Sequence, residues 1–444
     1  MYSKLIHYFK NCNMKIVDQI KKASLLLAVF AVCLTACNKL ELDPTPNPAA
    51  SQSTTPTLAT LLDAPEYSLL KSAAVKAKLY ANLGVPTLRY TVFAPDNAAI
   101  IASLRVPDEA TAAGYLASLP DAQVAGLVSY HIVPQLIAAS SISADFPNFQ
   151  YPTLLNPAPS VSPLLRLTTF PSVRTGVGAW VNNVPVIATD IQAVNGVMHK
   201  VLRIVAPPST DLWSRIQSDA ELTYFKAAIY RADTGVVPGK RLQDALNTSV
   251  NPNSIASNLT IFAPTDNAMK AFLVGAITQA LIAQGADPVT AQAQATGLVA
   301  GYGSAIISDP ASIPVYGPSL NAVITPTLAK GIAAYHILSS QKVLPKDTLY
   351  LPPGIRVFSV NIPSTAKQVT TLLNSGGWPL SLHPGVTITA SFVSPVPGVS
   401  VVAAATVKGL ANTTASNIII GPTSSDLHAV NGVLHKIDQV LLPQ

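Results

Sequence analysis

Cysteine and charge are both scarce in this chain. Three cysteines occur among 444 residues, and Cys12 and Cys33 lie in the leader segment described below, which leaves Cys37 alone in the remainder. That scarcity excludes a disulfide, a cysteine-ligated zinc site and a catalytic thiol from the folded body. Charged residues make up 11% of the chain and hydrophobic residues 49%, a composition that favours folded domains with large cores over disorder.

The few basic residues are unevenly distributed. The formal net charge is +6, but residues 1–36 hold five lysines and a single acidic residue, Asp18. The rest of the chain has 23 basic and 21 acidic residues. Since no basic stripe remains, we expect no nucleic-acid partner.

Long apolar runs and cofactor motifs are missing as well. After the leader, the apolar stretch from Ala271 to Ile282 is too short to cross a bilayer. The sequence contains no Gly-rich phosphate loop, no paired carboxylate motif and no calcium loop. We therefore expect no cofactor and no metal site.

The N-terminus has the pattern of a lipoprotein signal. Two lysines precede an apolar run at 23–34, and the run ends in Leu-Thr-Ala-Cys with its cysteine at position 37. This ending resembles the bacterial lipobox, in which a small residue precedes a cysteine that is lipidated and becomes the mature N-terminus. We predict a signal peptide at 1–36, with Met14 as an alternative start, and lipidation of Cys37. The other reading is an ordinary secretory signal in which Cys37 is incidental.

A lipid on Cys37 would hold the protein at a membrane without a spanning helix. Residues 37–57 are rich in Pro, Ser and Thr and are predicted to form a tether. Glu41 and Asp43, shortly after the cysteine, resemble a surface-export signal of Bacteroidota lipoproteins. We expect a lipid-anchored protein of the outer membrane in the cell envelope, and the sequence leaves open whether it faces the periplasm or the cell surface.

One phrase occurs twice. Residues 190–201 read DIQAVNGVMHKV and residues 426–437 read DLHAVNGVLHKI, with eight of the twelve positions identical. Two further marks recur in the same order, since TVFAPDNA returns as TIFAPTDNA and Tyr130-His131 returns as Tyr335-His336. Three marks found twice in one order predict two copies of one module.

The marks place the first module at 58–208 and the second at 209–444. The second is longer because it has expansions near 275–321 and 345–400. The first expansion is rich in Ala, Gly and Gln, which indicates a helical hairpin or a loop.

The repeated phrase contains an Asn-Gly pair, which is a strong two-residue hairpin signal because both turn positions need positive φ. We therefore predict hairpin turns at 195–196 and 431–432. In the strand that follows, alternation places His435 on the more apolar face. A metal ligand or general base is one reading, and a buried histidine satisfied by a backbone carbonyl or hydroxyl is the other. The second is favoured because no partner with metal-ligand spacing recurs beside it.

Each Tyr-His pair ends an apolar helical stretch. A catalytic use would require a nucleophile and an orienting acid repeated nearby. Asp96 and Asp190 are repeated acids, but no serine recurs at a matching place. We expect no catalytic residues, and we expect both pairs to be half-buried with their polar tips hydrogen-bonded.

Taken in order, the three marks resemble the fasciclin domain, present here twice over nearly the whole mature chain. The resemblance implies an α+β fold in which each module is a β-wedge or sandwich flanked by small helices. The first copy lacks one residue of the usual Phe-Ala-Pro-Thr-Asp-Asn-Ala phrase, and the second has long insertions.

The resemblance also implies a function. Fasciclin domains are extracellular or cell-surface modules associated with adhesion and matrix interactions, usually without enzymatic activity. In animal members, an Asp-Ile pair before the Asn-Gly pair and the Tyr-His region are linked to integrin binding. The candidate interaction residues that match here are Asp190, Ile191, Asp426, Leu427, Tyr130, His131, Tyr335 and His336. The Glu-Pro that precedes Asp-Ile in some animal members is absent here, so the resemblance implies a binding module and names no ligand.

We therefore expect a non-enzymatic cell-envelope lipoprotein that uses its fasciclin modules for adhesion or interaction with a protein or glycan. The alternative is a glycan-binding accessory lipoprotein of a polysaccharide-uptake system, served by the insertions of the second module. A hydrolase is the third hypothesis, and it would need a nucleophile beside His131, His199, His336 or His435.

Overall fold

The computed structural model describes residues 55–142, 146, 149–250, 257–314, 317–338, 355–374, 383–396 and 398–443. The predicted signal peptide, Cys37 and most of the predicted tether lie outside the described residues, as does part of the expansion near 345–400. All described residues belong to one unit that begins at Thr55. Within them, no helix combines the length and the apolar character that a membrane crossing requires.

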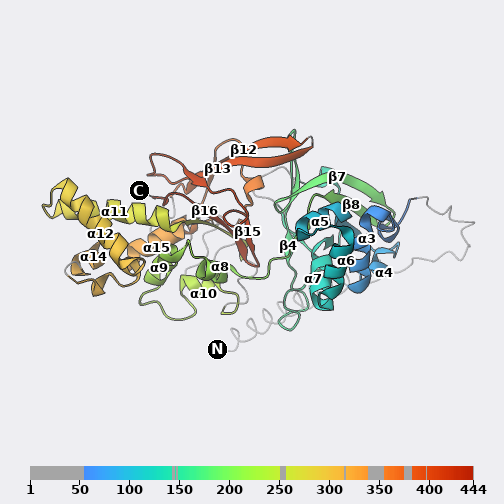
Figure 1. The fold of residues 1–444 in the computed structure, drawn as a ribbon, viewed down its shortest axis with the longest axis horizontal. Coiled ribbons are helices and arrows are strands. Elements are labelled where there is room, and N and C mark those ends of the chain that lie inside the picture. The colour runs from blue at the N-terminus through green and yellow to red at the C-terminus, as the bar shows by residue number, and fades with distance from the viewer. Residues whose placement is uncertain are drawn as a thin grey trace, which may run out of the picture. The chain divides into compact units, whose positions relative to one another are not determined.

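The first module consists of short helices, with β1 between α4 and α5, followed by the other strands (Figure 1). Its helices are α2 (Leu58–Leu61), η1 (Pro65–Tyr67), α3 (Ser68–Lys76), α4 (Tyr80–Leu83), α5 (Asn97–Leu104), α6 (Glu109–Ser118), α7 (Asp121–Tyr130) and η2 (Ala139–Ser141). Its strands are β1 (Tyr90–Pro95), β2 (Ile132–Val133), β3 (Tyr151–Pro152), β4 (Thr168–Thr169), β5 (Pro171–Arg174), β6 (Gly178–Val181), β7 (Val184–Ala193) and β8 (Gly196–Val201).

The second module repeats this order with additions. Its helices are α8 (Leu212–Ser218), α9 (Thr223–Ala232), α10 (Leu242–Leu246), α11 (Asp266–Ala283), α12 (Pro288–Tyr302), α13 (Ala305–Ser308), η4 (Pro310–Ser312), α14 (Gly317–Val323), α15 (Pro326–Tyr335), η5 (Ser359–Asn361) and η6 (Leu372–Asn374). Its strands are β9 (Leu259–Pro264), β10 (Ile337–Leu338), β11 (Lys367–Val369), β12 (Val386–Val396), β13 (Val399–Lys408), β14 (Ser416–Ile418), β15 (Leu427–Ala429) and β16 (Gly432–Ile437).

The sheets show that each module has its own core and that the two cores have the same arrangement. In the first, the strand order is β2-β1-β8-β7-β6-β5, and β1 pairs in parallel with β8 so that Phe93 lies opposite His199. In the second, the order starts β10-β9-β16, and β9 pairs in parallel with β16 so that Phe262 lies opposite His435. The register is therefore the same in both copies, and the α+β fold class is as predicted from the sequence.

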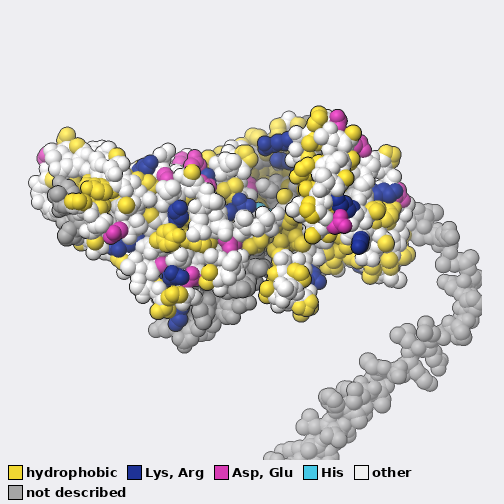
Figure 2. All heavy atoms as spheres, turned by 60° about the horizontal axis from the view of Figure 1, so that its bottom comes forward, with side chains coloured by type: hydrophobic (Ala, Val, Ile, Leu, Met, Phe, Trp, Pro, Cys, Tyr) yellow, Lys and Arg dark blue, Asp and Glu magenta, His cyan; other side chains and the backbone are white. Residues whose placement is uncertain are grey.

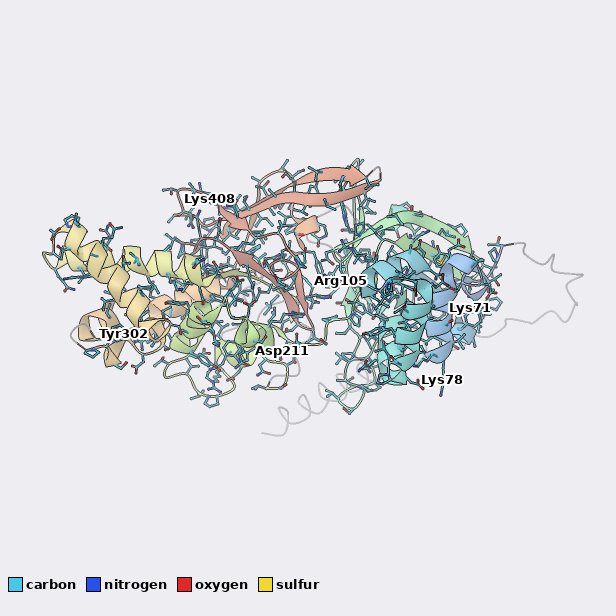
Figure 3. All side chains as sticks on the ribbon, in the orientation of Figure 1. Lys71, Lys78, Arg105, Asp211, Tyr302 and Lys408 are labelled. Atoms are coloured by element: carbon cyan, nitrogen blue, oxygen red, sulfur yellow. The ribbon has the colours of Figure 1, made fainter. Side chains whose placement is uncertain are left out.

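Local chemistry explains where the elements begin. The Phe-Ala-Pro phrases lie in β1 and β9, whose residues are all buried. Asp96 then caps α5 by accepting from the backbone N–H of Ala99 over 2.7 Å. Asp211, at the start of α8 (Figure 3), accepts from the N–H of Ser214 over 2.7 Å in the same way.

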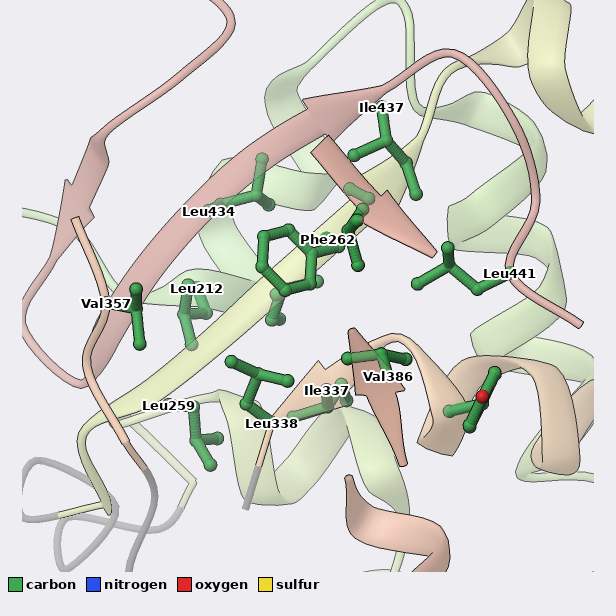
Figure 4. Packing of buried hydrophobic residues seen from close by; sticks show 14 of the residues in the cluster. Leu212, Leu259, Phe262, Ile337, Leu338, Val357, Val386, Leu434, Ile437 and Leu441 are labelled. Carbon is green, nitrogen blue, oxygen red and sulfur yellow. The ribbon is translucent and has the colours of Figure 1, made fainter. Parts of the chain in front are cut away.

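The second module has a core that gathers side chains from distant parts of the chain. Phe262 of β9 lies among aliphatic side chains of β10, β12 and β16 (Figure 4). Both Phe262 and Leu434 are 0% exposed. Full burial of such side chains stabilises a fold by about 1.5–3 kcal/mol each.

The two expansions form different structures. In the first, α11 and α12 pack together as a helical hairpin, which is one of the two expected alternatives. The start of α11 corresponds to α5 of the first module, and the expansion lengthens this helix. The described part of the second contains η5, β11, η6 and β12, and β12 pairs antiparallel with β13 in a long hairpin.

Candidate functional site

The aspartate and histidine of the repeated phrase are bonded to each other. In the first module, the backbone N–H of Asp190 donates to Nδ1 of His199 over 3.2 Å. The proton of the neutral ring is therefore on Nε2, which donates to the Ile137 carbonyl over 2.8 Å. The Asp190 carboxylate accepts from the N–H of Ala139 over 2.9 Å. These bonds hold β7 and β8 against the segment after β2, and we call the arrangement the Asp–His clamp.

The second module has the same clamp. The N–H of Asp426 donates to Nδ1 of His435 over 3.2 Å, and Nε2 donates to the Val357 carbonyl over 2.8 Å. The Asp426 carboxylate accepts from the N–H and the hydroxyl of Ser359 over 2.7 and 2.6 Å. In both modules, a single residue thus lies between the one whose carbonyl and the one whose N–H the clamp engages.

Burial and backbone conformation show that the clamp is structural. Asp190 and Asp426 have φ of 57° and 54°, a region that aspartate tolerates better than bulky residues. His199 is 1% exposed and His435 0%, which confirms the prediction of buried histidines satisfied by backbone carbonyls. Burial lowers the pKa of His199, so its ring stays neutral. In the described part of the chain, no group of three or more His, Cys, Asp or Glu is placed to hold a metal ion.

The predicted hairpins are present, but each turn lies one residue earlier than expected. Val194 and Asn195 form the turn, while the glycine already belongs to β8. The Asn195 side chain is buried, accepting from the N–H of Leu58 over 2.9 Å and donating to the Leu83 carbonyl over 2.7 Å. A Cβ on Gly196 would lie 2.0 Å from the backbone oxygen of Tyr90. The pair therefore serves close strand packing and a buried amide bridge.

Asn431 and Gly432 have the same roles in the second module. Asn431 accepts from the N–H of Leu212 over 2.9 Å and donates to the Leu246 carbonyl over 2.9 Å. A Cβ on Gly432 would lie 2.4 Å from the backbone oxygen of Leu259. Each asparagine thus ties the opening helix of its module to the closing strand.

The Tyr-His pairs lie in the interior. Tyr130 donates to the Thr168 carbonyl over 2.9 Å, and the Tyr335 hydroxyl donates to the Gly385 carbonyl over 2.6 Å. Nδ1 of His131 donates to the Leu127 carbonyl over 2.8 Å. The polar tips are tied down as expected, but the side chains are buried rather than half-buried.

The histidines of these pairs have both ring nitrogens occupied. Nε2 of His131 accepts from the N–H of Val205 over 3.0 Å, and Nε2 of His336 accepts from that of Leu441 over 2.9 Å. Burial lowers the pKa of each imidazole to about 4. As candidate interaction residues, Tyr130, His131, Tyr335 and His336 are corrected to core residues, because a partner cannot reach them in this conformation.

The remaining candidates are the Asp-Ile and Asp-Leu pairs. Ile191 is half-buried and packs against the core of the first module, and Gln192 beside it is exposed. Leu427 is half-buried as well, but Asp426 and Leu427 line an open cavity of about 680 Å³. The two modules therefore present this position differently.

We call this cavity the seam groove, because residues of both modules line it. From the first module come parts of α5, α6 and α7, the β6–β7 turn and the segment after β8. From the second come Arg215, Pro422 and the stretch from Asp426 to His428. A cavity of this size lies in the range of small-ligand and peptide pockets.

Arginines surround His428 at one wall of the groove. The Arg215 Nε donates to the His428 carbonyl over 2.8 Å. A guanidinium N–H of Arg356 donates to Nε2 of His428 over 2.7 Å, so this ring also accepts and is neutral. Burial and then the two nearby guanidinium groups hold the pKa of His428 well below its usual value.

Arg356 is a buried cation. It is 4% exposed, donates to the Val430 carbonyl over 3.1 Å, and lies 5.0 Å from the ring centre of Phe170 in the first module. Burial lowers its pKa to about 10, and its Nε has no hydrogen-bond partner among the described atoms. No carboxylate is within hydrogen-bond distance of it in the described part of the chain. Sequence reasoning missed this residue, because its neighbours come from both modules.

Further contacts join the modules at the β12–β13 hairpin. Trp180 of β6 is 1% exposed, its Nε1 donates to the Ser400 carbonyl over 3.3 Å, and its ring centroid lies 5.9 Å from that of Phe392. The Ser172 hydroxyl accepts from the Asn361 side chain over 3.0 Å. Residues of the second expansion therefore contact β5 and β6 of the first module.

Charge on the molecular surface is mixed. Among the coloured, described atoms on the face shown in Figure 2, Lys and Arg side chains alternate with Asp and Glu, and no continuous basic stripe is visible. Local concentrations of one sign, such as the arginines around His428, are therefore features of particular sites.

These observations define the protein as a pair of α+β modules with the same strand register. Each module has its own Asp–His clamp and its own asparagine bridge. Residues 65–207 match the fasciclin domain, so the first module is a fasciclin domain. The second module repeats its core and clamps, which supports tandem fasciclin domains. Such domains are known for adhesion and interaction and are typically not catalytic.

A solved fasciclin (FAS1) domain pair from the insect cell adhesion molecule fasciclin I is 15% identical and covers 85% of this chain and 95% of its own, with a TM-score of 0.29. At that TM-score it carries no residue roles, so the second module is assigned from the repeat within the chain. No curated protein matches the sequence.

Proposed function

We propose that the protein is a non-enzymatic interaction protein of the cell envelope, anchored by a lipid on Cys37, which binds a ligand in the seam groove. The observation that carries this proposal is a division of roles within the repeat. The aspartate, asparagine and histidine shared by both copies are engaged in internal hydrogen bonds, whereas the one differing position that is not a swap between apolar residues, His428, lies at a groove built by both modules.

The internal bonds argue against catalysis by the repeated histidines. His131, His199, His336 and His435 each use both ring nitrogens with backbone partners. A general base needs a free ring nitrogen within reach of the proton it removes. An interaction role needs only an accessible surface, and the seam groove provides one.

The contacts between the modules support their action as one unit. Trp180, Phe170 and Phe358 form part of a buried apolar cluster that includes residues of both modules. A ligand in the groove would contact both sides at once, and binding to a pre-formed site avoids the cost of ordering it.

The test is complementation of a strain that lacks the gene. The intact gene should restore attachment of cells to matrix-coated surfaces and place the protein in the membrane fraction. A Cys37→Ser variant should fold but appear in the soluble fraction and fail to restore attachment. Unchanged attachment in the deletion strain on several surfaces would count against the proposal.

A glycan array tests the alternative that the protein binds glycans. Saturable, selective binding of the purified full chain across a broad glycan array would favour an accessory role in polysaccharide uptake. Flat responses across that array would favour a protein ligand.

A further inference from the structure

We propose that the seam groove takes an acidic peptide segment, with its carboxylates held by Arg203 and Arg215 and aliphatic neighbours packed on the leucines beside them. This inference rests on the proposed function, because it names the ligand class of the same site. It is argued from charge, from the donors that remain available and from the apolar lining.

The charges of the groove are not balanced internally. Arg203 and Arg215 line it, and Asp426 is the one acidic residue among its described lining residues. Both carboxylate oxygens of Asp426 accept hydrogen bonds from Ser359. Behind His428 lies Arg356, a buried cation without a carboxylate partner among the described residues. The site is therefore electropositive, and a low local dielectric strengthens its attraction for an anion.

The two arginines differ in how they are held. Arg215 is fixed by donation to the His428 carbonyl, and a guanidinium group has five N–H donors, so donors remain for a ligand. Arg203, from the first module, is exposed and lines the same groove, and no residue of the described chain is bonded to its guanidinium. One arginine is thus pre-oriented and the other adjustable, an arrangement that suits carboxylates at more than one position.

The rest of the lining favours a peptide. Leu104, Leu119 and Leu427 line the groove together with prolines, which have no N–H to donate. Among the polar lining residues, Ser103 and Asn182 are already engaged, since Ser103 donates to the Ala99 carbonyl and Asn182 to the Tyr130 hydroxyl. The exposed side-chain amides of Gln123 and Asn183 can bond the backbone of a peptide. A sugar needs many directional hydrogen bonds, whereas an acidic and aliphatic peptide matches guanidinium groups beside leucines.

The experiment uses the full chain, purified from membranes in non-ionic detergent, and fluorescence anisotropy. The probe is a labelled octapeptide of alternating leucine and aspartate. The comparison ligands are its leucine–asparagine analogue and an oligogalacturonate. We expect saturable binding of the acidic peptide, which weakens several-fold from about 50 to about 300 mM salt, and no binding of the neutral analogue.

The decisive variant is Arg203→Glu, since Arg203 is exposed and has no structural bond to lose. We expect it to weaken binding of the acidic peptide by about tenfold or more, while Arg203→Lys retains most of the affinity. Lys408→Glu is the matched control. Lys408 is exposed at the end of β13 and outside the groove lining (Figure 3), so its reversal should leave binding unchanged.

Three results would overturn the inference: equal binding of the neutral peptide, an unaltered affinity in Arg203→Glu, or binding of the oligogalacturonate without binding of the acidic peptide. Failure of this inference differs from failure of the proposed function. If the intact gene restores attachment but the acidic peptide does not bind, only the ligand class is wrong. If the deletion strain attaches normally, the proposed function is wrong whatever the peptide does.

Discussion

The two modules have the same Asp–His clamp and asparagine bridge and differ at the seam groove. Position 192 of the first module is an exposed glutamine that donates to the carbonyl of its neighbour Asp190. The equivalent position in the second module is His428, which accepts from Arg356 and lies 5.1 Å from Phe358, measured between ring centroids. In this duplicated chain, the residues that both copies share therefore stabilise the fold. The residue that differs, His428 in place of Gln192, contributes to the groove in the second module alone.

A second difference concerns the lysine of the repeated phrase. Lys200 forms an ion pair with Asp96 at 2.8 Å, with 27% of its side chain exposed. Lys436 is 4% exposed and pairs with both Asp219 and Glu221 at 2.7 Å. The repeated lysine thus pairs with an aspartate directly after β1 in the first module. In the second module it pairs with acidic residues of the α8–α9 connection. The position is shared and the partner is not.

The largest expected effect comes from the paired glycines, which should be equally intolerant of change. In both Gly196→Ala and Gly432→Ala, the new Cβ would collide with backbone oxygen of the neighbouring strand. Because backbone must move, we expect each to lower the free energy of unfolding by more than about 4 kcal/mol. Urea unfolding followed by circular dichroism measures this.

Gly297→Ala in α12 is the control, since nothing lies within 4 Å of its added Cβ. It should be neutral or stabilising by about 0.5–1 kcal/mol. Tolerance of either strand substitution would break the equivalence of the two cores.

A smaller effect should separate the modules. Trp180→Ala removes a buried side chain at their contact and should lower stability by about 3–5 kcal/mol. Calorimetry should then resolve two transitions where the intact protein shows closer or merged melting. Tyr302→Ala, at a partly exposed tyrosine in α12, should change the free energy of unfolding by no more than about 0.5 kcal/mol and leave the shape of the thermogram unaltered.

Coupling between the two sides is the sharper measurement. Phe392→Ala removes the ring that faces Trp180 from the second module. In a double-mutant cycle the two substitutions should be non-additive, because they remove one contact. Additive losses would mean that Trp180 stabilises its own module alone.

The smallest effect is a pH dependence that both modules should share. His131 and His336 have folded pKa values of about 4, below the ordinary value near 6.5, so the unfolded chain binds more protons at acid pH. Stability should be constant above about pH 6.5 and fall as the pH drops toward 4. At pH 5 each histidine should contribute a loss of about 2 kcal/mol relative to neutral pH.

The check is urea unfolding at pH 7.5 and 5 for the intact protein and for His131→Gln and His336→Gln. Each substitution should remove a similar part of the difference between the two pH values, whatever it does to absolute stability. A loss confined to one variant would show that the two Tyr-His sites are not equivalent.

The sequence predicted what local pattern controls. Two modules, the Phe-Ala-Pro strands and buried, carbonyl-bonded histidines follow from repetition and alternation, and the structure has them. The Asn-Gly pair predicted the hairpin but not the exact turn position, because Gly196 belongs to closely packed β8 and the amide of Asn195 bridges segments far apart in the chain. Arg356 and Trp180 gave no local signal, since their partners lie far away along the chain and some of them belong to the other module. His428 did give one, as the departure from its counterpart at position 192.

The parallel pairing of first and last strands has a consequence for the order of events during synthesis. The sheet of the first module can form only after β8, with His199, has been synthesised to pair with β1. The sheet of the second module likewise requires β16, with His435. Pairings between such distant residues form slowly. The first module can close while the second is still being made, and the second half then stays unfinished longest. That half is where protection from aggregation matters most during biogenesis.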